Sequence, residues 1–165
     1  GAGGRAPGGC RKKFGVEGWP GHDAGAYAAL RASAASAGEV PRKVRIVGYD
    51  CDRARVAEAQ SNLQSAGLEK TCEVQVAQAL EFAPRPGWNG WIVCNPPYGE
   101  RMGDDSKLIP LYRDFGRLLR ERCEGFSLAL LSGNPDLADR LALPDFERRA
   151  LRNGSIPCEL ILGRI

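Results

Sequence analysis

Residues 91–98 read WIVCNPPY, and no other stretch says more about the fold. The apolar run Trp91–Cys94 predicts a short strand. Two prolines end that strand at once, because proline has no amide hydrogen to donate to a sheet ladder. The same prolines keep the backbone extended, so Asn95 and a proline carbonyl are held rigidly as hydrogen-bond acceptors. Tyr98 adds a ring face on which a planar base can stack, although the segment could also be a stiff turn that closes a strand.

Helices and strands alternate on both sides of this stretch. Helical spacing of apolar residues predicts helices at residues 23–37, 53–66, 107–122 and 134–142. Further strands are predicted at residues 44–49, 72–77 and 126–131, and a hairpin around Asn153-Gly154 joins residues 148–152 and 158–162. This alternation predicts an α/β fold with a mostly parallel sheet and an antiparallel C-terminal hairpin. Residues 1–21, rich in glycine and basic residues, are expected to form a loop or arm. In the helix predicted at residues 107–122, Tyr112 is assigned to the apolar stripe.

The composition fits one globular domain of 165 residues with a formal net charge of +3. No apolar run reaches the ~20 residues that span a bilayer, so no membrane partner is expected. One histidine and six cysteines without a Cys-x-x-Cys pair argue against a metal site, and we expect reduced cysteines and a cytoplasmic protein. The mild positive charge permits an RNA partner. Basic residues that could contact phosphates are Arg11, Lys12, Lys13 and Arg101.

Polar residues follow the predicted strands at their carboxyl ends, where ligands bind in open α/β sheets. Asp50 and Asp52 come after the strand at residues 44–49. An acid at this place can accept hydrogen bonds from a ribose diol, and it can equally cap the next helix. Because Asp52 lies nearer the helix, we assign the cap to Asp52 and the ribose to Asp50. Gln78 follows the next strand, and Ser132-Gly133-Asn134 follows the strand at residues 126–131.

The segment Asn95–Tyr98 resembles the motif of class I S-adenosylmethionine (SAM) enzymes that methylate an exocyclic amine or a glutamine amide. Longer stretches narrow the resemblance: NPPYGERMGDDSKLIPLYRDFGRLLR at residues 95–120, SGNPDL at 132–137, RNGSIPCEL at 152–160 and FGVEGWPGHDAGAY at 14–27. Together they are similar to the THUMP-associated RNA methyltransferases, and most closely to the branch that makes N2-methylguanosine in 23S rRNA. The resemblance covers essentially the whole chain.

The resemblance implies a Rossmann-like methyltransferase sheet, SAM as cofactor and guanine N2 of 23S rRNA as substrate. Residue by residue, it implies a catalytic role for Asn95, Pro96, Pro97 and Tyr98. It implies cofactor contacts from Asp50, Cys51, Gln78, Ala79 and Asn95. Gln78 stands where the family usually has aspartate, and Glu100 and Arg101 match an extension typical of this branch.

Two features of the family do not occur in this sequence. The first strand of the sheet, with its Gly-rich loop, would lie upstream of residue 1, and no THUMP domain is present. We therefore interpret residues 1–165 as a partial methyltransferase domain that is inactive alone. Unpaired sheet edges in such a chain would favour a homodimer.

Other functions share parts of this pattern. An adenine-N6 methyltransferase or a protein-glutamine methyltransferase would carry the same Asn-Pro-Pro-Tyr motif. A catalytically silent RNA-binding or assembly module would explain the absent Gly-rich loop. A dinucleotide-dependent oxidoreductase fits poorly, because no G-x-G-x-x-G follows a strand.

Overall fold

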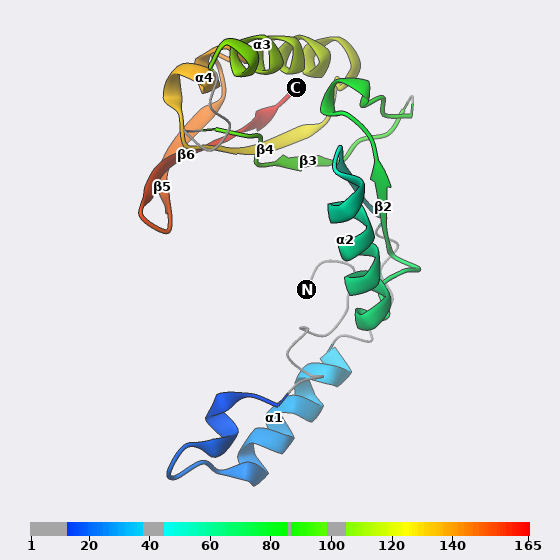
Figure 1. The fold of residues 1–165 in the computed structure, drawn as a ribbon, viewed down its shortest axis with the longest axis vertical. Helices are drawn as coiled ribbons and strands as arrows, with labels where there is room; N and C mark the ends of the chain where they lie inside the picture. Colours follow the sequence, from blue (N-terminus) through cyan, green and yellow to red (C-terminus); the bar gives the residue numbers. More distant parts are fainter. Residues whose placement is uncertain (1–12, 38–44, 86, 99–104) are drawn as a thin grey trace. The chain divides into compact units, whose positions relative to one another are not determined.

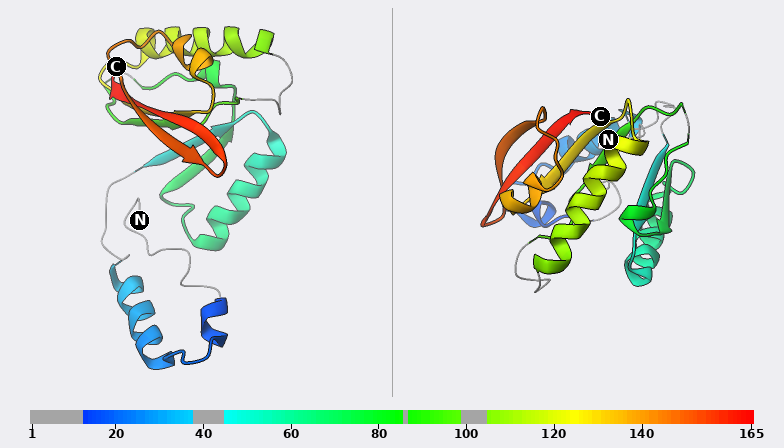
Figure 2. Two further views of the ribbon diagram at one scale, coloured as in Figure 1. Left: turned by 90° about the vertical axis from the view of Figure 1, so that its left-hand side faces the viewer. Right: turned by 90° about the horizontal axis from the view of Figure 1, so that it is seen from above.

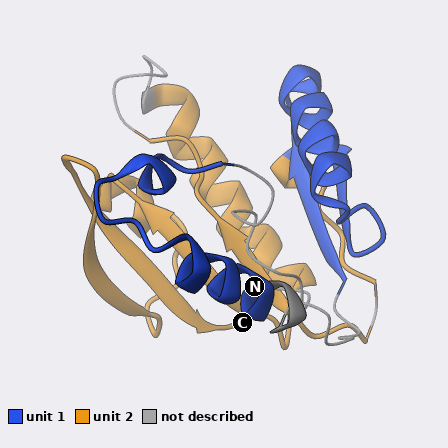
Figure 3. Cartoon of the chain, turned by 90° about the horizontal axis from the view of Figure 1, so that it is seen from below, with its two compact units in different colours: residues 1–78 blue, residues 79–165 orange. Residues whose placement is uncertain are grey.

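The computed structural model describes residues 13–37, 45–85, 87–98 and 105–165 (Figure 1). The chain divides into two compact units, residues 1–78 and residues 79–165 (Figure 3). Each unit has a sheet of its own, with two strands in the first unit and four in the second.

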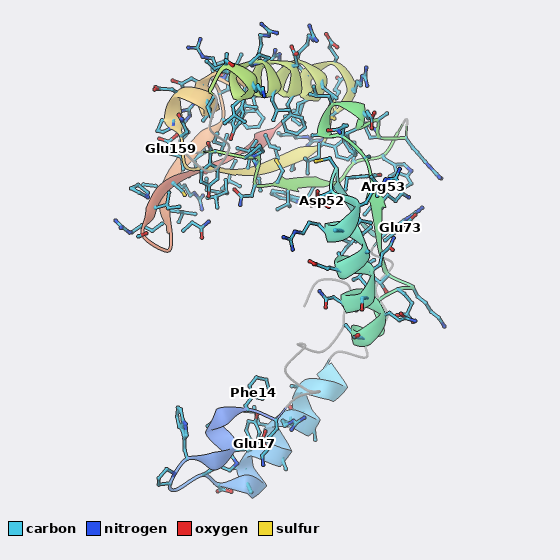
Figure 4. The ribbon with its side chains drawn as sticks, in the orientation of Figure 1. Phe14, Glu17, Asp52, Arg53, Glu73 and Glu159 are labelled. Carbon is cyan, nitrogen blue, oxygen red and sulfur yellow. The ribbon has the colours of Figure 1, made fainter. Side chains whose placement is uncertain are left out.

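The first unit contains a short helical segment ahead of its sheet. A 3-10 helix, η3 (Gly15–Gly18), precedes α1 (Ala24–Ala37). The loop or arm predicted for residues 1–21 therefore includes one helical turn. Local hydrogen bonding explains it, because the Glu17 carboxylate accepts from the backbone amide of Phe14 at 2.7 Å and so caps η3 (Figure 4).

The two strands of the first unit belong to one βαβ motif. It consists of β1 (Ile46–Asp50), α2 (Arg53–Ala66) and β2 (Cys72–Val76), with the strands paired in parallel. Asp52 is the N-cap of α2, as predicted, and accepts from the amides of Ala54 and Arg55. Gly67 ends α2 at a φ of 63°, a left-handed conformation that suits glycine. Within the described residues of this unit, Val56 of α2 is the one buried side chain.

The second unit is a four-stranded sheet covered on one face by a long helix (Figures 1 and 2). Its elements are η4 (Ala79–Glu81), β3 (Trp91–Cys94), α3 (Asp105–Arg122), β4 (Ser127–Ser132), α4 (Pro135–Asp139), β5 (Glu147–Asn153) and β6 (Ile156–Arg164). The strand order is β3-β4-β6-β5. β3 and β4 are parallel, whereas β6 is antiparallel to both β4 and β5. The predicted α/β fold with a C-terminal antiparallel hairpin is confirmed.

The core of the second unit lies between α3 and the sheet. The apolar stripe predicted for α3 is buried, and Leu119 has 0% exposure. The side chains that form this core with it are Leu108, Tyr112, Phe115, Leu118, Leu128, Leu130 and Ile161. No helix in the described ranges combines the length and the apolar character that a membrane crossing needs.

Two elements of the second unit differ most from their predicted extent. The helix predicted at residues 134–142 is shorter and ends at Asp139, and the φ of 52° at Ala142 excludes an α-helix through the predicted end. The Arg120 guanidinium donates to the carbonyls of Leu141 and Ala142, at 2.6 and 3.0 Å, and stabilises this end. β6 is longer than the strand predicted at residues 158–162 and includes Pro157. Pro157 pairs with Arg152 of β5 but precedes the part of β6 that pairs with β4, which begins at Glu159.

Cysteines of the described residues are all free. They are Cys51, Cys72, Cys94, Cys123 and Cys158, whereas Cys10 lies outside those residues. No two of these five form a disulfide in the structure, and their reduced state stays a prediction. Burial raises the pKa of the Cys94 thiol to about 12, and it also raises the pKa of Cys123. Cys51 is exposed.

These environments predict how fast each thiol reacts. At pH 8 a thiol with a pKa near 12 is ionised in only about one molecule in ten thousand, and the thiolate is the reactive form. We expect iodoacetamide to label Cys51 rapidly and Cys94, Cys123 and Cys158 slowly, as followed by peptide mass spectrometry. In urea all should react at similar rates. Equal labelling of Cys94 and Cys51 in the folded chain would contradict the burial of Cys94.

The close packing around Gly116 predicts how a substitution there changes the stability of the fold. A Cβ atom at this position of α3 would overlap the backbone of Leu141. Gly116→Ala should lower the free energy of unfolding by about 1–3 kcal/mol through overpacking. This loss would outweigh the gain of about 1 kcal/mol in helix propensity. Urea unfolding would measure it, with Gly18→Ala as control, since a Cβ at Gly18 meets nothing within 4 Å. A Gly116→Ala midpoint at or above that of the parent would refute the clash.

Candidate active site

The Asn-Pro-Pro-Tyr segment lies where the sequence predicts it, directly after the last residue of β3. Because β3 and β4 run in parallel, this segment comes next to the residues that follow β4. There Ser132 is buried with 1% exposure, and Asn134 caps α4 by accepting from the Leu137 amide at 3.1 Å. The expected gathering of polar residues at the carboxyl ends of strands is therefore confirmed for β3 and β4.

Tyr98 is held on its ring and at its hydroxyl. The ring packs against Gly133 so closely that a Cβ there would overlap ring atoms Cδ2 and Cε2. The hydroxyl accepts from Asn153 Nδ2 at 3.2 Å, and Cys158 Sγ lies 3.8 Å away as a second, weaker donor. Asn153 ends β5 and Cys158 belongs to β6, so the C-terminal hairpin orients the tyrosine of the motif.

The carbonyl of Pro97 is hydrogen-bonded to a buried side chain of the core. It accepts from the hydroxyl of Tyr112, with 3.2 Å between the oxygens. The same hydroxyl lies 3.4 Å from Ser132 Oγ, and Tyr112 and Ser132 are each 1% exposed. Burial is the main cause that raises the pKa of Tyr112. The hydroxyl is therefore protonated near neutral pH and able to donate.

Asn95 offers its acceptors to the outside of the fold. The side chain is exposed, and the preceding Cys94 is partly buried against the core. Within the described part of the chain, neither the Asn95 side chain nor the Pro96 carbonyl has a hydrogen-bond partner. Two acceptors on neighbouring residues can bind the two protons of one amino group.

The carboxyl ends of β1 and β2 form a second group of predicted residues, in the first unit. Asp50 pairs with Val76 in the parallel register, and its carbonyl accepts from the Ala77 amide at 3.0 Å. The Asp50 carboxylate is exposed, and Oδ1 accepts from the Asp52 amide at 2.8 Å. Its other oxygen can still accept, which fits a ribose hydroxyl. Cys51 and Gln78 are also exposed near these strand ends.

The remaining predicted residues are distributed differently. Ala79 begins η4 and belongs to the second unit. Lys13 is exposed, whereas Arg11, Lys12, Glu100 and Arg101 lie outside the described residues. In the ranges that the structure describes, no three His, Cys, Asp or Glu side chains are grouped so that they could hold a metal ion.

Four residues around the motif were not predicted as part of a site: Tyr112, Ser132, Gly133 and Asn153. Tyr112 was assigned to an apolar stripe and Asn153 to a hairpin turn. Ser132 and Gly133 were recognised only as residues at a strand end. One signal in the sequence pointed to Tyr112. A phenylalanine would fit the apolar stripe of α3 equally well, so the tyrosine hydroxyl at this position indicates a hydrogen bond.

Comparison with known proteins agrees with this arrangement. A family model described as the RMKL-like methyltransferase domain matches residues 3–161. A ribosomal RNA large subunit methyltransferase K/L from Stutzerimonas stutzeri is 34% identical over 160 residues, which are 94% of this chain and 22% of that protein. A protein of the same name from Methylococcus capsulatus is 39% identical over 159 residues, covering 95% and 21%. The chain thus spans about a fifth of the length of these curated relatives.

Solved structures support the same assignment. The SMU.472 protein in complex with S-adenosylhomocysteine (SAH) has a TM-score of 0.83 at 27% identity, over 94% of this chain and 41% of that one. A possible methylase from Clostridium difficile 630 gives the same values. Both likenesses extend beyond the motif to nearly all of the chain, and the predicted Rossmann-like class is confirmed. This chain therefore belongs to the RMKL-like methyltransferase-domain family.

Proposed function

We propose that this chain carries the amine-binding part of a SAM-dependent RNA methyltransferase, with guanine N2 of 23S rRNA as the substrate. The observation that carries the proposal is the pair of unpartnered acceptors, the Asn95 side chain and the Pro96 carbonyl, at the end of β3. The names of the curated relatives support an RNA substrate in the ribosome. SAH in the SMU.472 structure supports the cofactor.

The acceptors would solve a specific chemical problem. An exocyclic amine of a nucleobase is a weak nucleophile, because its lone pair is conjugated with the ring. Asn95 Oδ1 and the Pro96 carbonyl would each accept one amine proton, which directs the lone pair along the line of transfer. The same two oxygens would stabilise the positive charge that develops on the nitrogen. The proton can leave after transfer, so no strong general base is required.

The cofactor would be bound by residues at the ends of β1 and β2. SAM supplies the electrophilic methyl group when it is bound. The exposed Asp50 carboxylate, held through Oδ1 by the Asp52 amide, suits the ribose hydroxyls. Cys51 and Gln78 would border the adenine. The cofactor contacts that the family resemblance implies for Ala79 and Asn95 belong to the second unit and stay predictions.

RNA would be bound by an aromatic face and by basic residues. Tyr98, seated on Gly133, would stack on a base that is extruded from its helix. Arg11, Lys12, Lys13 and Arg101 would contact phosphates, so their substitution should flatten the salt dependence of RNA binding. Cytoplasmic location and homodimer formation through open sheet edges stay predictions.

Substitution of Asn95 tests the role in methyl transfer. In the enzyme that contains this chain, Asn95→Ala should lower methylation of ribosomal RNA by roughly 10²–10³-fold, because one preorganised acceptor is lost. Affinity for SAH should stay within a few-fold of the parent. Asn62→Ala, at an exposed position of α2, is the matched control. Full turnover by the Asn95→Ala variant would remove Asn95 from the mechanism.

The choice of substrate separates the proposal from its alternatives. Ribosomal RNA, duplex DNA and a glutamine-containing protein substrate should be offered in parallel with labelled SAM. We expect label only in RNA, at N2 of guanine. Label in adenine or in glutamine would indicate one of the other amino-methyltransferases. RNA binding that does not depend on SAM, without any label transferred, would indicate a catalytically silent module.

Substitution of Asp50 tests the cofactor site. Asp50→Ala should weaken SAH binding by about 10-fold or more in a calorimetric titration, since a hydrogen bond to a charged group contributes ~1.5–3 kcal/mol. Asp52→Asn is the control, because it keeps an N-cap side chain for α2 and should leave the affinity unchanged. Equal affinities of the Asp50→Ala variant and the parent would place the ribose elsewhere.

A further inference from the structure

The prolines restrict the backbone of the Asn-Pro-Pro-Tyr segment from ψ of Asn95 to φ of Pro97. Both proline rings fix their own φ. The ψ angles of Asn95 and Pro96 are restricted in turn, because each of these residues precedes a proline. The ψ angle of Pro97 is the first soft torsion after this rigid stretch. Rotation about it turns the Pro97 carbonyl and changes the direction in which the chain continues to Tyr98.

The hydroxyl of Tyr112 acts at this torsion. It donates to the Pro97 carbonyl at 3.2 Å, and rotation about ψ of Pro97 would break this hydrogen bond. Tyr112 cannot follow such a rotation, because its side chain is 1% exposed in the core beneath the sheet end. The contact joins α3 to a segment 15 residues earlier in the chain.

The hydrogen bonds of Ser132 leave the Tyr112 hydroxyl free to act as a donor. The Asn134 amide donates to Ser132 Oγ at 3.2 Å, and the Ser132 hydroxyl donates its one proton to the Asn134 carbonyl at 3.1 Å. Ser132 Oγ, 3.4 Å from the Tyr112 oxygen, can therefore only accept from Tyr112 in this arrangement. The Pro97 carbonyl, at 3.2 Å, is the nearer of the two acceptors for the Tyr112 proton.

Packing alone does not account for a tyrosine at this position. Phenylalanine would fill the same space in the stripe of α3, and a buried hydroxyl is unfavourable unless it is hydrogen-bonded. Burial raises the pKa of Tyr112, so the hydroxyl stays a donor across the physiological range. Its nearer acceptor is the carbonyl of Pro97, and the direction of this carbonyl changes together with the direction of Tyr98.

We infer that Tyr112 is a positioning residue, whose hydroxyl holds the Pro97 carbonyl and thereby seats the Tyr98 ring on Gly133. Asn153 holds the far end of the same ring by its hydroxyl at 3.2 Å. Tyr98 is thus placed by one contact to its preceding backbone and one to its side chain. The inference concerns the geometry of this chain, and only its consequence for methyl transfer rests on the proposed function.

The chain has four tyrosines, Tyr27, Tyr49, Tyr98 and Tyr112, so ring-labelled protein gives a simple NMR spectrum. The readout is the nuclear Overhauser effect between the Tyr98 ring and the α protons of Gly133. Tyr112→Phe keeps the ring and removes the hydroxyl. We expect the effect to weaken at least about two-fold and the Tyr98 ring signal to broaden, while Tyr27 and Tyr49 keep their signals. An unchanged Tyr98–Gly133 effect would overturn the inference.

A matched variant separates positioning from general loosening of the core. Leu119→Val removes a methylene two turns further along α3, where Leu119 is 0% exposed. It should lower stability by at least as much as Tyr112→Phe and leave the Tyr98–Gly133 effect intact. If both variants weaken that effect equally, Tyr112 is an ordinary core residue and the inference fails.

Kinetics of the enzyme that contains this chain give the second readout. Tyr112→Phe should lower kcat for RNA methylation by about 10-fold through misplacement of the target base, with SAH affinity unchanged. An unchanged kcat beside a weakened Tyr98–Gly133 effect would overturn the role in catalysis. If the parent enzyme methylates no RNA, the proposed function fails, and the NMR result still decides whether Tyr112 positions Tyr98.

Discussion

Burial of one face of α3 against β4 and β6 is the interaction on which the second unit depends. Leu119, Leu128, Leu130 and Ile161 have 1% exposure or less. Each such side chain contributes about 1.5–3 kcal/mol relative to an exposed one. The same packing places Tyr112 under the end of β3. The Asn-Pro-Pro-Tyr segment, which we propose to bind the amine, is therefore attached to the core of the unit through the hydrogen bond from Tyr112 to Pro97.

The first unit is built on much less buried surface. Within its described residues, Val56 is the one side chain that reaches full burial. Asp50, Cys51 and Gln78 are exposed and depend on the ends of two short strands. These three proposed cofactor contacts thus lie in the less buried unit, whereas Ala79 and the Asn-Pro-Pro-Tyr segment belong to the second unit.

Much of the fold could be predicted because the elements have local signals. The apolar spacing along α3, Asp52 and Gly67 at the ends of α2, and the prolines after β3 act within a few residues. Asn95, Asp50 and Tyr98 could be selected from their place at strand ends. The partners of Tyr98 and Pro97 could not. Tyr112 shows only that it faces the core, and its bond to Pro97 depends on how α3 settles on the sheet. The extension of β6 through Pro157 could not be predicted for the same reason, since it depends on which strands pair beside it.

The bond from Asn153 to Tyr98 links residues 55 positions apart, and Asn153 lies close to the C-terminal end of the chain. During translation the Asn-Pro-Pro-Tyr segment is synthesised before β5 and β6. Contacts of such sequence separation form late, because loop closure must precede them. Tyr98 thus acquires its final orientation only when the last strands are in place. Nascent chains that stop short of β5 lack the Asn153 contact, so the orientation of Tyr98 requires that β5 and β6 have been synthesised.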